Sequence, residues 1–263
     1  SHGIPVQEIE IETIRQGEQS WPFTIDNIAL ACYVKMGGTP WTISTYEQTH
    51  HELIIGMGNA VIQKARGGRS EKFVGITNVF SADGNYLLNN ISREIQSENY
   101  KEELLESLKS TINEISKSNA WKSGDNVRLI FHQQFKDFRQ EDVDAIKEFV
   151  SQYKELKIEF CFVRISEDHP YQIYDTNQNG IEQKYGSLMK GEYAPQRGVC
   201  IEVGPRTILL CVTAPEHLMT PLQGIPKPLQ ITLHRDSTYQ DLNYIAKQVY
   251  HFTFLNWRTF NPT

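Results

Sequence analysis

ELIIGMGNAVI at residues 52–62, KFVGITNVFS at 72–81 and YLLNNI at 86–91 are three short apolar runs separated by turn signals. The pair Asp83-Gly84 stands between the second run and the third, and this dipeptide is typical of tight turns. Runs of this length and composition, joined by turns, favour β-strands. The three runs therefore predict an antiparallel meander.

The residues after the meander alternate between helical and strand patterns. Leucines and isoleucines recur at helical spacing over residues 100–118, and one face of residues 140–153 carries Val143, Ile146, Phe149 and Val150. NVRLIF at 126–131 and KIEFCFVRI at 157–165 read as buried strands. Three antiparallel strands, a helix, a strand, a helix and a strand form the order of a ribonuclease-H-like α/β domain. Composition alone would support only a mixed α/β class.

Further elements are predicted on both sides of this block. A strand is expected over residues 4–20, and a helix after an N-cap at Thr24 that ends at Gly37-Gly38. Later elements are a hairpin of strands 197–203 and 207–213, turned by Gly204-Pro205, and a final helix over 239–252. No internal repeat or linker divides the chain.

Composition and charge exclude several classes of protein. The chain has 263 residues, 39% of them hydrophobic and 22% charged, which excludes wholesale disorder and coiled coil. The formal net charge of -6 excludes nucleic-acid binding through bulk positive charge, so such binding needs a local basic groove. No apolar run approaches the roughly 18 residues that span a bilayer, and the four cysteines lack CxxC spacing. We therefore expect a cytoplasmic protein with reduced thiols and no membrane partner.

Specific strings resemble the Argonaute proteins, at the end of their MID domain and through their PIWI domain. The strings are GIPVQ (3–7), NIA (27–29), YVKMGGTPW (33–41), IIG (54–56), GIPKP (224–228), HRDST (234–238) and LNWR (255–258). They occur in collinear order over nearly the whole chain. The resemblance implies an α/β fold: a ribonuclease-H-like PIWI domain, with a mixed central sheet flanked by helices, at residues 46–263. Residues 1–45 would be the C-terminal part of a Rossmann-like MID domain, and the last strand and helix of PIWI would lie beyond Thr263.

In Argonautes, a glutamine and the lysine of a KxGG string converge on the 5′ phosphate of the guide. The resemblance carries these roles to Gln7 and Lys35. An ammonium and an amide donor suit a phosphate monoester, and in the family a Mg²⁺ often shares the pocket. From the residues alone, Lys35 also reads as a lysine that complements a helix C-terminus, and Gln7 as an ordinary polar residue.

The positions that hold catalytic carboxylates in cleaving PIWI domains are neutral here. The resemblance places Gly58 at the first aspartate position, with Asn59 beside it, and Gln134 at the third. Two divalent cations need several anionic ligands, so we expect no nuclease activity and no metal site within the chain. Asp83 reads as a turn residue. The alternative is a guide-directed endonuclease with unusual ligands, such as Asn59, Asp83 or Asp137.

The strings at residues 55–60 and 74–87, together with the lost carboxylates, resemble the catalytically inactive short prokaryotic Argonautes. This resemblance implies a short guide RNA with a 5′ phosphate and a single-stranded DNA target. It also implies an APAZ-containing partner with a sirtuin-like or TIR effector domain, acting in defence against plasmids and phage. A third possibility is an interaction scaffold that has lost guide loading.

Basic side chains provide candidate contacts to a nucleic-acid backbone. Lys64, Arg66 and Arg69 lie in a glycine-rich stretch, which also reads as a solvated hairpin tip. Arg235 and Arg258 belong to two of the Argonaute-like strings. We expect all five to contact the phosphates of a guide or its target.

Overall fold

The computed structural model describes residues 6–15, 21–44, 49–63, 70–89, 100–134, 136–184, 186 and 188–255. The chain divides into two compact units, Ser1–Thr42 and Ile43–Thr263. This division lies three residues before the boundary expected from the sequence. The assignment of the first unit to a MID domain stays a prediction.

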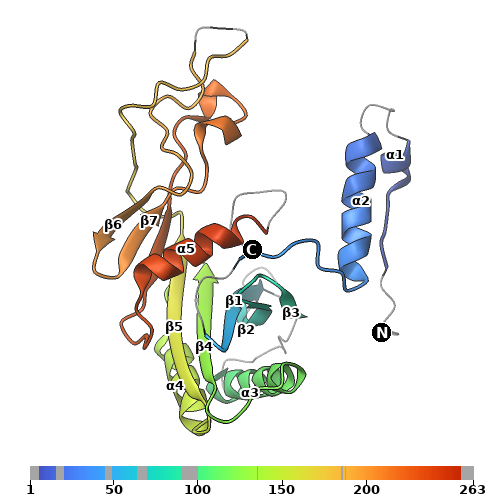
Figure 1. Ribbon diagram of the computed structural model, residues 1–263, viewed down its shortest axis with the longest axis vertical. Coiled ribbons are helices and arrows are strands. Elements are labelled where there is room, and N and C mark those ends of the chain that lie inside the picture. Colours follow the sequence, from blue (N-terminus) through green and yellow to red (C-terminus); the bar gives the residue numbers. More distant parts are fainter. Residues whose placement is uncertain are drawn as a thin grey trace. The chain divides into compact units, whose positions relative to one another are not determined.

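The second unit is built on one mixed β-sheet (Figure 1). In the described residues its strand order is β3-β2-β1-β4-β5-β8-β7-β6. The strands are β1 His51–Gln63, β2 Ser70–Ser81, β3 Tyr86–Asn89, β4 Asn126–Gln134, β5 Lys157–Ser166, β6 Cys200–Gly204, β7 Thr207–Leu210 and β8 Leu229–Leu233. β1, β4 and β5 are parallel to one another, whereas the pairs on either side of them are antiparallel. The ribonuclease-H-like order predicted from the sequence is confirmed.

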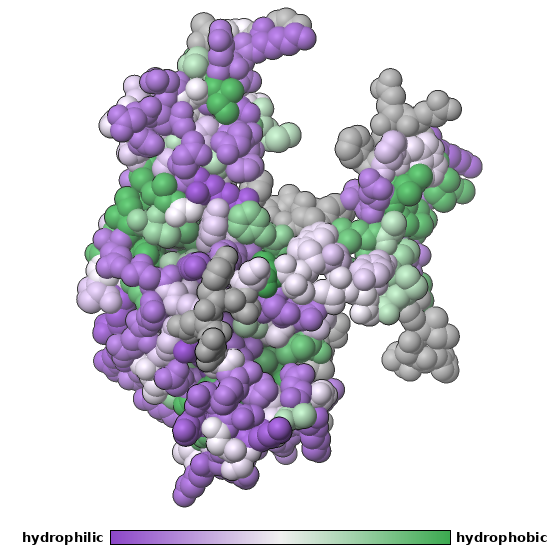
Figure 2. Space-filling view, viewed as in Figure 1, coloured by the Kyte–Doolittle hydropathy of each residue, from purple (hydrophilic) through white to green (hydrophobic). Residues whose placement is uncertain are grey.

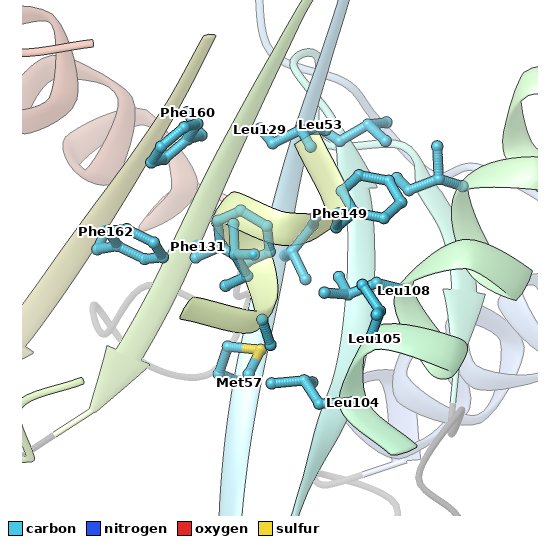
Figure 3. Close-up of a cluster of buried hydrophobic side chains, with 14 of the residues drawn as sticks. Leu53, Met57, Leu104, Leu105, Leu108, Leu129, Phe131, Phe149, Phe160 and Phe162 are labelled. Atoms are coloured by element: carbon cyan, nitrogen blue, oxygen red, sulfur yellow. The ribbon is translucent and has the colours of Figure 1, made fainter. Parts of the chain in front are cut away.

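Helices cover both faces of this sheet. α3 (Tyr100–Ser118) and α4 (Gln140–Gln152) pack on one face, where their apolar stripes meet Leu53, Leu129 and Phe131 in one buried cluster (Figure 3). α5 (Leu242–Phe252) packs on the other face in a second cluster. Their opposite, polar sides explain the largely hydrophilic surface over α3 and α4 in Figure 2.

Side-chain alternation assigns each residue of β1 and β4 to one of these faces. Leu53, Ile55 and Met57 belong to the cluster under α3 and α4, whereas Ile130 belongs to the cluster under α5. Because Ile54 is in register with Ile130, the even-numbered residues of both strands face α5. This assignment includes the candidate positions at the ends of the two strands.

The first unit differs from the expectation of a strand over residues 4–20. Its described part has no strand there and instead contains α1 (Ile11–Ile14) and α2 (Trp21–Lys35). Ile9, Ile11 and Ile14 are all exposed, so the alternation that suggested a strand has no sheet to bury it. The predicted N-cap at Thr24 is also wrong, because α2 begins at Trp21 and a proline is well tolerated in a first helical turn.

The strands and the helix in the last third of the chain are shorter than the sequence predicted. The hairpin is confirmed, but β6 begins at Cys200, since Gly198 has a positive φ of 91° that no strand adopts. α5 begins at Leu242, where the side chain of Asp241 caps it by accepting from the backbone N–H of Tyr244. Two short 3₁₀ turns, Pro215–His217 and Pro221–Gln223, lie between β7 and β8. Among the described residues, no helix combines the length and apolarity needed to span a membrane.

Candidate nucleic-acid site

The two neutral candidate positions lie next to each other at the ends of neighbouring strands. β1 and β4 are paired in parallel up to Met57 and Gln133, and Gly58 and Gln134 follow directly. Gln134 is exposed and is the last residue of β4. The structure therefore brings together two positions that are 76 residues apart in sequence, as the resemblance implied, and neither carries a charge.

His132 lies in β4 two residues before Gln134, and both side chains belong to the face that α5 covers. Its ring is buried, and its Nε2 atom has no hydrogen-bond partner among the described residues. Burial alone lowers the pKa of His132 to about 4, so the imidazole is neutral at physiological pH. The buried side chain next to Gly58 and Gln134 is therefore also uncharged.

The two carboxylates considered as unusual metal ligands serve other contacts, Asp137 with Arg164 at 2.9 Å and Asp83 within its own turn. Asp83 accepts hydrogen bonds from the Ser81 hydroxyl and, at 3.1 Å, from the backbone N–H of Asn85, which makes it the turn residue that the sequence predicted. Ser81 pairs with Leu53, five residues or roughly 17 Å along β1 from Gly58. Asp83 therefore lies too far from the strand ends to share a metal ion there.

The described residues at the strand ends do not fit a pair of divalent cations. No group of three or more His, Cys, Asp or Glu side chains in the described part of the chain could hold a metal ion. Gln134 offers one neutral amide oxygen, and Mg²⁺ in proteins is held through carboxylates. Gly58 and Gln134 therefore supply no anionic ligand at the two strand ends.

A basic pocket lies just beyond the carboxyl end of β4. Three arginines, two threonines and one aspartate line it, and it encloses about 270 Å³. We call it the arginine pocket, and its polar lining is Asp137, Arg164, Arg206, Thr207, Thr232, His234 and Arg235. Of these, Arg235 was expected to contact phosphates and Asp137 was considered as an unusual metal ligand. The signal for Arg164 was its place as the only charged residue between Phe160 and Ser166, near the end of an otherwise apolar strand.

The structure also places the two residues of the predicted guide pocket near each other. The Lys35 ammonium, at the end of α2, donates to the backbone carbonyl of Val6 at 2.6 Å, next to Gln7 in the chain. The Gln7 amide donates from Nε2 to the carbonyl of Glu8 at 2.9 Å. Lys35 and Gln7 therefore lie close together, as binding of one phosphate by both requires. Their phosphate-binding role stays a prediction.

Several predicted residues lie outside the described part of the structure. Lys64, Arg66, Arg69 and Arg258 belong to this group. Asn59 lies in β1, but its side chain is also outside the description. Their expected backbone contacts stay predictions.

At the opposite end of the same strands lies a buried ion cluster. Arg128 reaches Glu52 at 3.2 Å and Glu159 at 3.3 Å, and its guanidinium stacks 3.7 Å from the centre of the Tyr239 ring. Glu52 also accepts from the hydroxyl of Tyr244 and from the Gln248 amide of α5. These contacts hold α5 against the sheet. The cluster lies at the opposite ends of the strands from Gly58 and Gln134, so it is not part of the candidate site.

His50 and His51 also lie at this amino-terminal end. His51 Nε2 is 3.0 Å from Asp125 and its ring stacks on Trp121 with centroids 4.9 Å apart. A hydrogen bond from the backbone of Lys122, followed by the one from His51, lowers the pKa of Asp125. This is a local structural contact rather than part of the strand-end site.

Comparisons with known proteins identify the family of this fold. The Piwi domain family model matches residues 1–263. The chain is 37% identical over 266 residues to the protein argonaute of Cereibacter sphaeroides, covering 99% of this chain and 34% of that protein. It is 23% identical to a Piwi protein of Archaeoglobus fulgidus, covering 98% of this chain and 59% of that protein. The chain thus spans about a third and somewhat over half of these two relatives.

Solved structures agree at the level of the fold. The crystal structure of A. aeolicus Argonaute matches 99% of this chain and 33% of its own with a TM-score of 0.59 at 14% identity. A second structure, of Aa-Ago with externally bound siRNA, matches 99% of this chain and 32% of its own with a TM-score of 0.55 at 15% identity. With a Piwi family match along its whole length, an argonaute relative and a similar fold in solved Argonaute structures, this chain belongs to the Piwi domain family.

Proposed function

We propose that this chain is the PIWI part of an Argonaute that holds a guide and a complementary target without cutting the target. The observation that carries the proposal is the pair of neutral positions, Gly58 and Gln134, at adjacent strand ends. The externally bound siRNA of Aa-Ago supports RNA as a ligand class for this fold. Pairing between guide and target would supply the sequence specificity, while the protein reads shape and backbone.

The proposed lack of cleavage follows from charge. In two-metal phosphoryl transfer, carboxylates hold two cations that activate the attacking water and stabilise the leaving oxygen. Gly58 has no side chain and Gln134 has no charge, so neither position offsets the charge of two dications. Gly58 and Gln134 leave room for a nucleic-acid strand but do not hold the two metal ions that would activate water against it.

A cleavage assay tests this part of the proposal. The complete protein is loaded with a 5′-phosphorylated guide and incubated with a complementary or a scrambled target, in Mg²⁺ or Mn²⁺. We expect the complementary target to be bound and to stay intact. Guide-dependent cleavage opposite guide positions 10 and 11 would refute the proposal and favour an endonuclease with unusual ligands.

The guide's 5′ phosphate is proposed to bind at Lys35 and Gln7. Lys35 uses one of its three N–H donors on Val6, and the others can reach a phosphate oxygen. The two side chains offer one neutral oxygen, Oε1 of Gln7, so they fit a phosphate better than the several-oxygen shell of a Mg²⁺ ion. A Mg²⁺ at this pocket would need ligands from outside this pair.

Guide retention tests this assignment. Lys35→Ala should release 5′-phosphorylated RNA about tenfold more readily, because a charge-assisted contact of about 1.5–3 kcal/mol is lost. Lys117→Ala, an exposed lysine at the end of α3, is the matched control. Equal retention by both variants, or an equal effect on a guide with a 5′ hydroxyl, would count against the pocket. Absence of any short RNA from the native protein would favour the scaffold alternative.

The proposed partners are a guide RNA, a single-stranded DNA target and an APAZ-containing effector with a sirtuin-like or TIR domain, in the prokaryotic cytoplasm. The support is the resemblance of residues 55–60 and 74–87 to short inactive Argonautes. In such a complex, target binding would switch on NAD consumption by the partner in defence against plasmids and phage. Purification of the native complex, followed by an NAD assay with and without target DNA, tests this. A complex with no second polypeptide would refute the partnership.

A further inference from the structure

The arginine pocket has the composition of a phosphate site. Three guanidinium groups, from Arg164, Arg206 and Arg235, line it together with the single carboxylate of Asp137. Asp137 is already paired with Arg164 at 2.9 Å, which leaves two positive charges in excess. The whole chain has a net charge of -6, so this local excess opposes the general charge of the molecule.

The sheet register places the pocket's donors in one row. Arg164 of β5 pairs with Thr232 of β8, and Thr232 pairs with Thr207 of β7, so the three side chains point to the same face. No hydrogen bond to either threonine hydroxyl is found among the described residues. A phosphate oxygen over this row would meet hydroxyl and guanidinium donors together.

Arg164 is held in place before any ligand binds. Its side chain is 25% exposed, and its two terminal nitrogens contact Asp137 at 2.9 Å and Gln230 at 3.1 Å. Its buried Nε has no hydrogen-bond partner in the described part of the chain. A fixed guanidinium loses less side-chain entropy on binding than a free one.

The other two arginines flank this fixed group and are open to solvent. Arg206 lies in the β6–β7 turn, exposed, and no ion pair involves it in the described residues. The Arg235 side chain is 71% exposed and lies 4.0 Å from Asp236, whose carboxylate is closer to Lys147, at 3.2 Å. Both guanidiniums are therefore accessible to a ligand that enters from solvent.

We propose that the arginine pocket binds a backbone phosphate of the nucleic acid held by this domain. Arg164 is in register with Gln133, so the pocket lies near the carboxyl end of β4, on the sheet face opposite to that of Gln134. A guanidinium neutralises a phosphate through bidentate hydrogen bonds but, unlike a metal ion, activates no water. The pocket therefore holds a strand near the end of β4 without providing the means to cut it. This inference rests on the proposed function.

The test measures target binding by the complete guide-loaded protein over a range of salt concentrations. The variant Arg206→Ala/Arg235→Ala removes the two exposed arginines and leaves Arg164 in place. Lys117→Ala/Lys154→Ala removes the same charge at exposed positions on α3 and after α4, and serves as control. Thermal unfolding verifies that both variants are folded.

We expect the arginine variant to bind target about tenfold more weakly at low salt, whatever the sequence of a complementary pair. The slope of log affinity against log salt should become shallower by about 1, since one phosphate contact is lost, and the control should keep the original slope. An unchanged slope in the arginine variant would overturn the inference. So would a variant that loses binding of inorganic phosphate or free nucleotide alone, since the pocket would then serve a small anion.

The outcome is separable from that of the proposed function. If the unmodified protein binds neither guide nor target, the proposed function fails. If the unmodified protein binds both and the arginine variant behaves like the control, only the pocket assignment fails.

Discussion

At their amino-terminal ends, β1 and β4 bury Glu52 and Arg128, whereas six residues further along the same face they carry Gly58 and Gln134. The distance between the two ends is roughly 20 Å. Charge is thus present where α5 supplies partners for it and absent from the two positions on which the proposed lack of cleavage rests. The comparison shows that the buried charges of these two strands serve the packing of α5.

Removing the carboxylate at the charged end should have the largest effect. Glu52→Ala removes the buried carboxylate that pairs with the buried Arg128. It also removes the acceptor that Tyr244 and Gln248 share. Breaking a buried pair in this way destabilises by about 3–5 kcal/mol. Chemical denaturation measures the loss.

Glu159→Ala is the matched control for this cluster. Glu159 contacts the same guanidinium, but its side chain is 56% exposed, so its loss should destabilise by about 1 kcal/mol or less. Equal effects of the two substitutions would show that burial by α5 does not set the energetics of this end of the strands.

His132 offers a pH test of the neutral end. Burial holds its folded pKa at about 4, below the unfolded value near 6.5, so the unfolded chain binds the extra proton between these values. The stability that this difference contributes is complete above about pH 6.5 and is lost as the pH falls toward 4. Between pH 7.5 and 5 the loss is about 2 kcal/mol.

His132→Leu should remove this part of the pH dependence. The substitution also removes the buried Nε2 atom, which has no partner in the described part of the chain, so stability at pH 7 should not fall by more than about 1 kcal/mol. Unfolding free energies of both proteins at pH 5 and 7.5 provide the measurement. Parallel curves for the two proteins would mean that the imidazole is already protonated or solvated in the native state.

Much of the sheet and of its covering helices could be predicted, because the apolar pattern of each element is contained within a short stretch of sequence. Leu104, Leu108 and Ile112 are buried as their spacing indicates, and the apolar runs of β1, β4 and β5 have the lengths of buried strands. The alternation before residue 15 misled because a strand needs a neighbouring strand, and the described part of the first unit contains none. Periodicity reports how a segment could be buried, and not whether a partner exists.

The candidate site was predictable only in part, for a similar reason. The strand-end positions Gly58 and Gln134 followed from the resemblance, and the register confirms that they adjoin. The arginine pocket did not, because Arg164, Arg206 and Arg235 come from a strand, a turn and a loop that only the antiparallel register of β5, β8 and β7 brings together. No spacing rule along the sequence links these three residues.

Restoring carboxylates at the neutral end should give the smallest effect, and a conditional one. In Gly58→Asp/Gln134→Asp, two carboxylates would follow the last paired residues of adjacent strands on one face, close enough to share one cation. Without metal, like charges side by side should destabilise the variant. With Mn²⁺ at about ten times its dissociation constant, the gain should be about 1.4 kcal/mol.

Thermal unfolding in Mn²⁺ and in chelator measures this gain, and Gly58→Asn/Gln134→Asn is the neutral control of matched shape. The aspartate variant should be stabilised by metal and the asparagine variant should not, because only anionic oxygens offset the charge of the cation. A response in both variants would mean that the metal binds elsewhere. A response in neither would show that the two strand ends are not held close enough together, and would remove the geometric basis for regarding this edge as an emptied metal site.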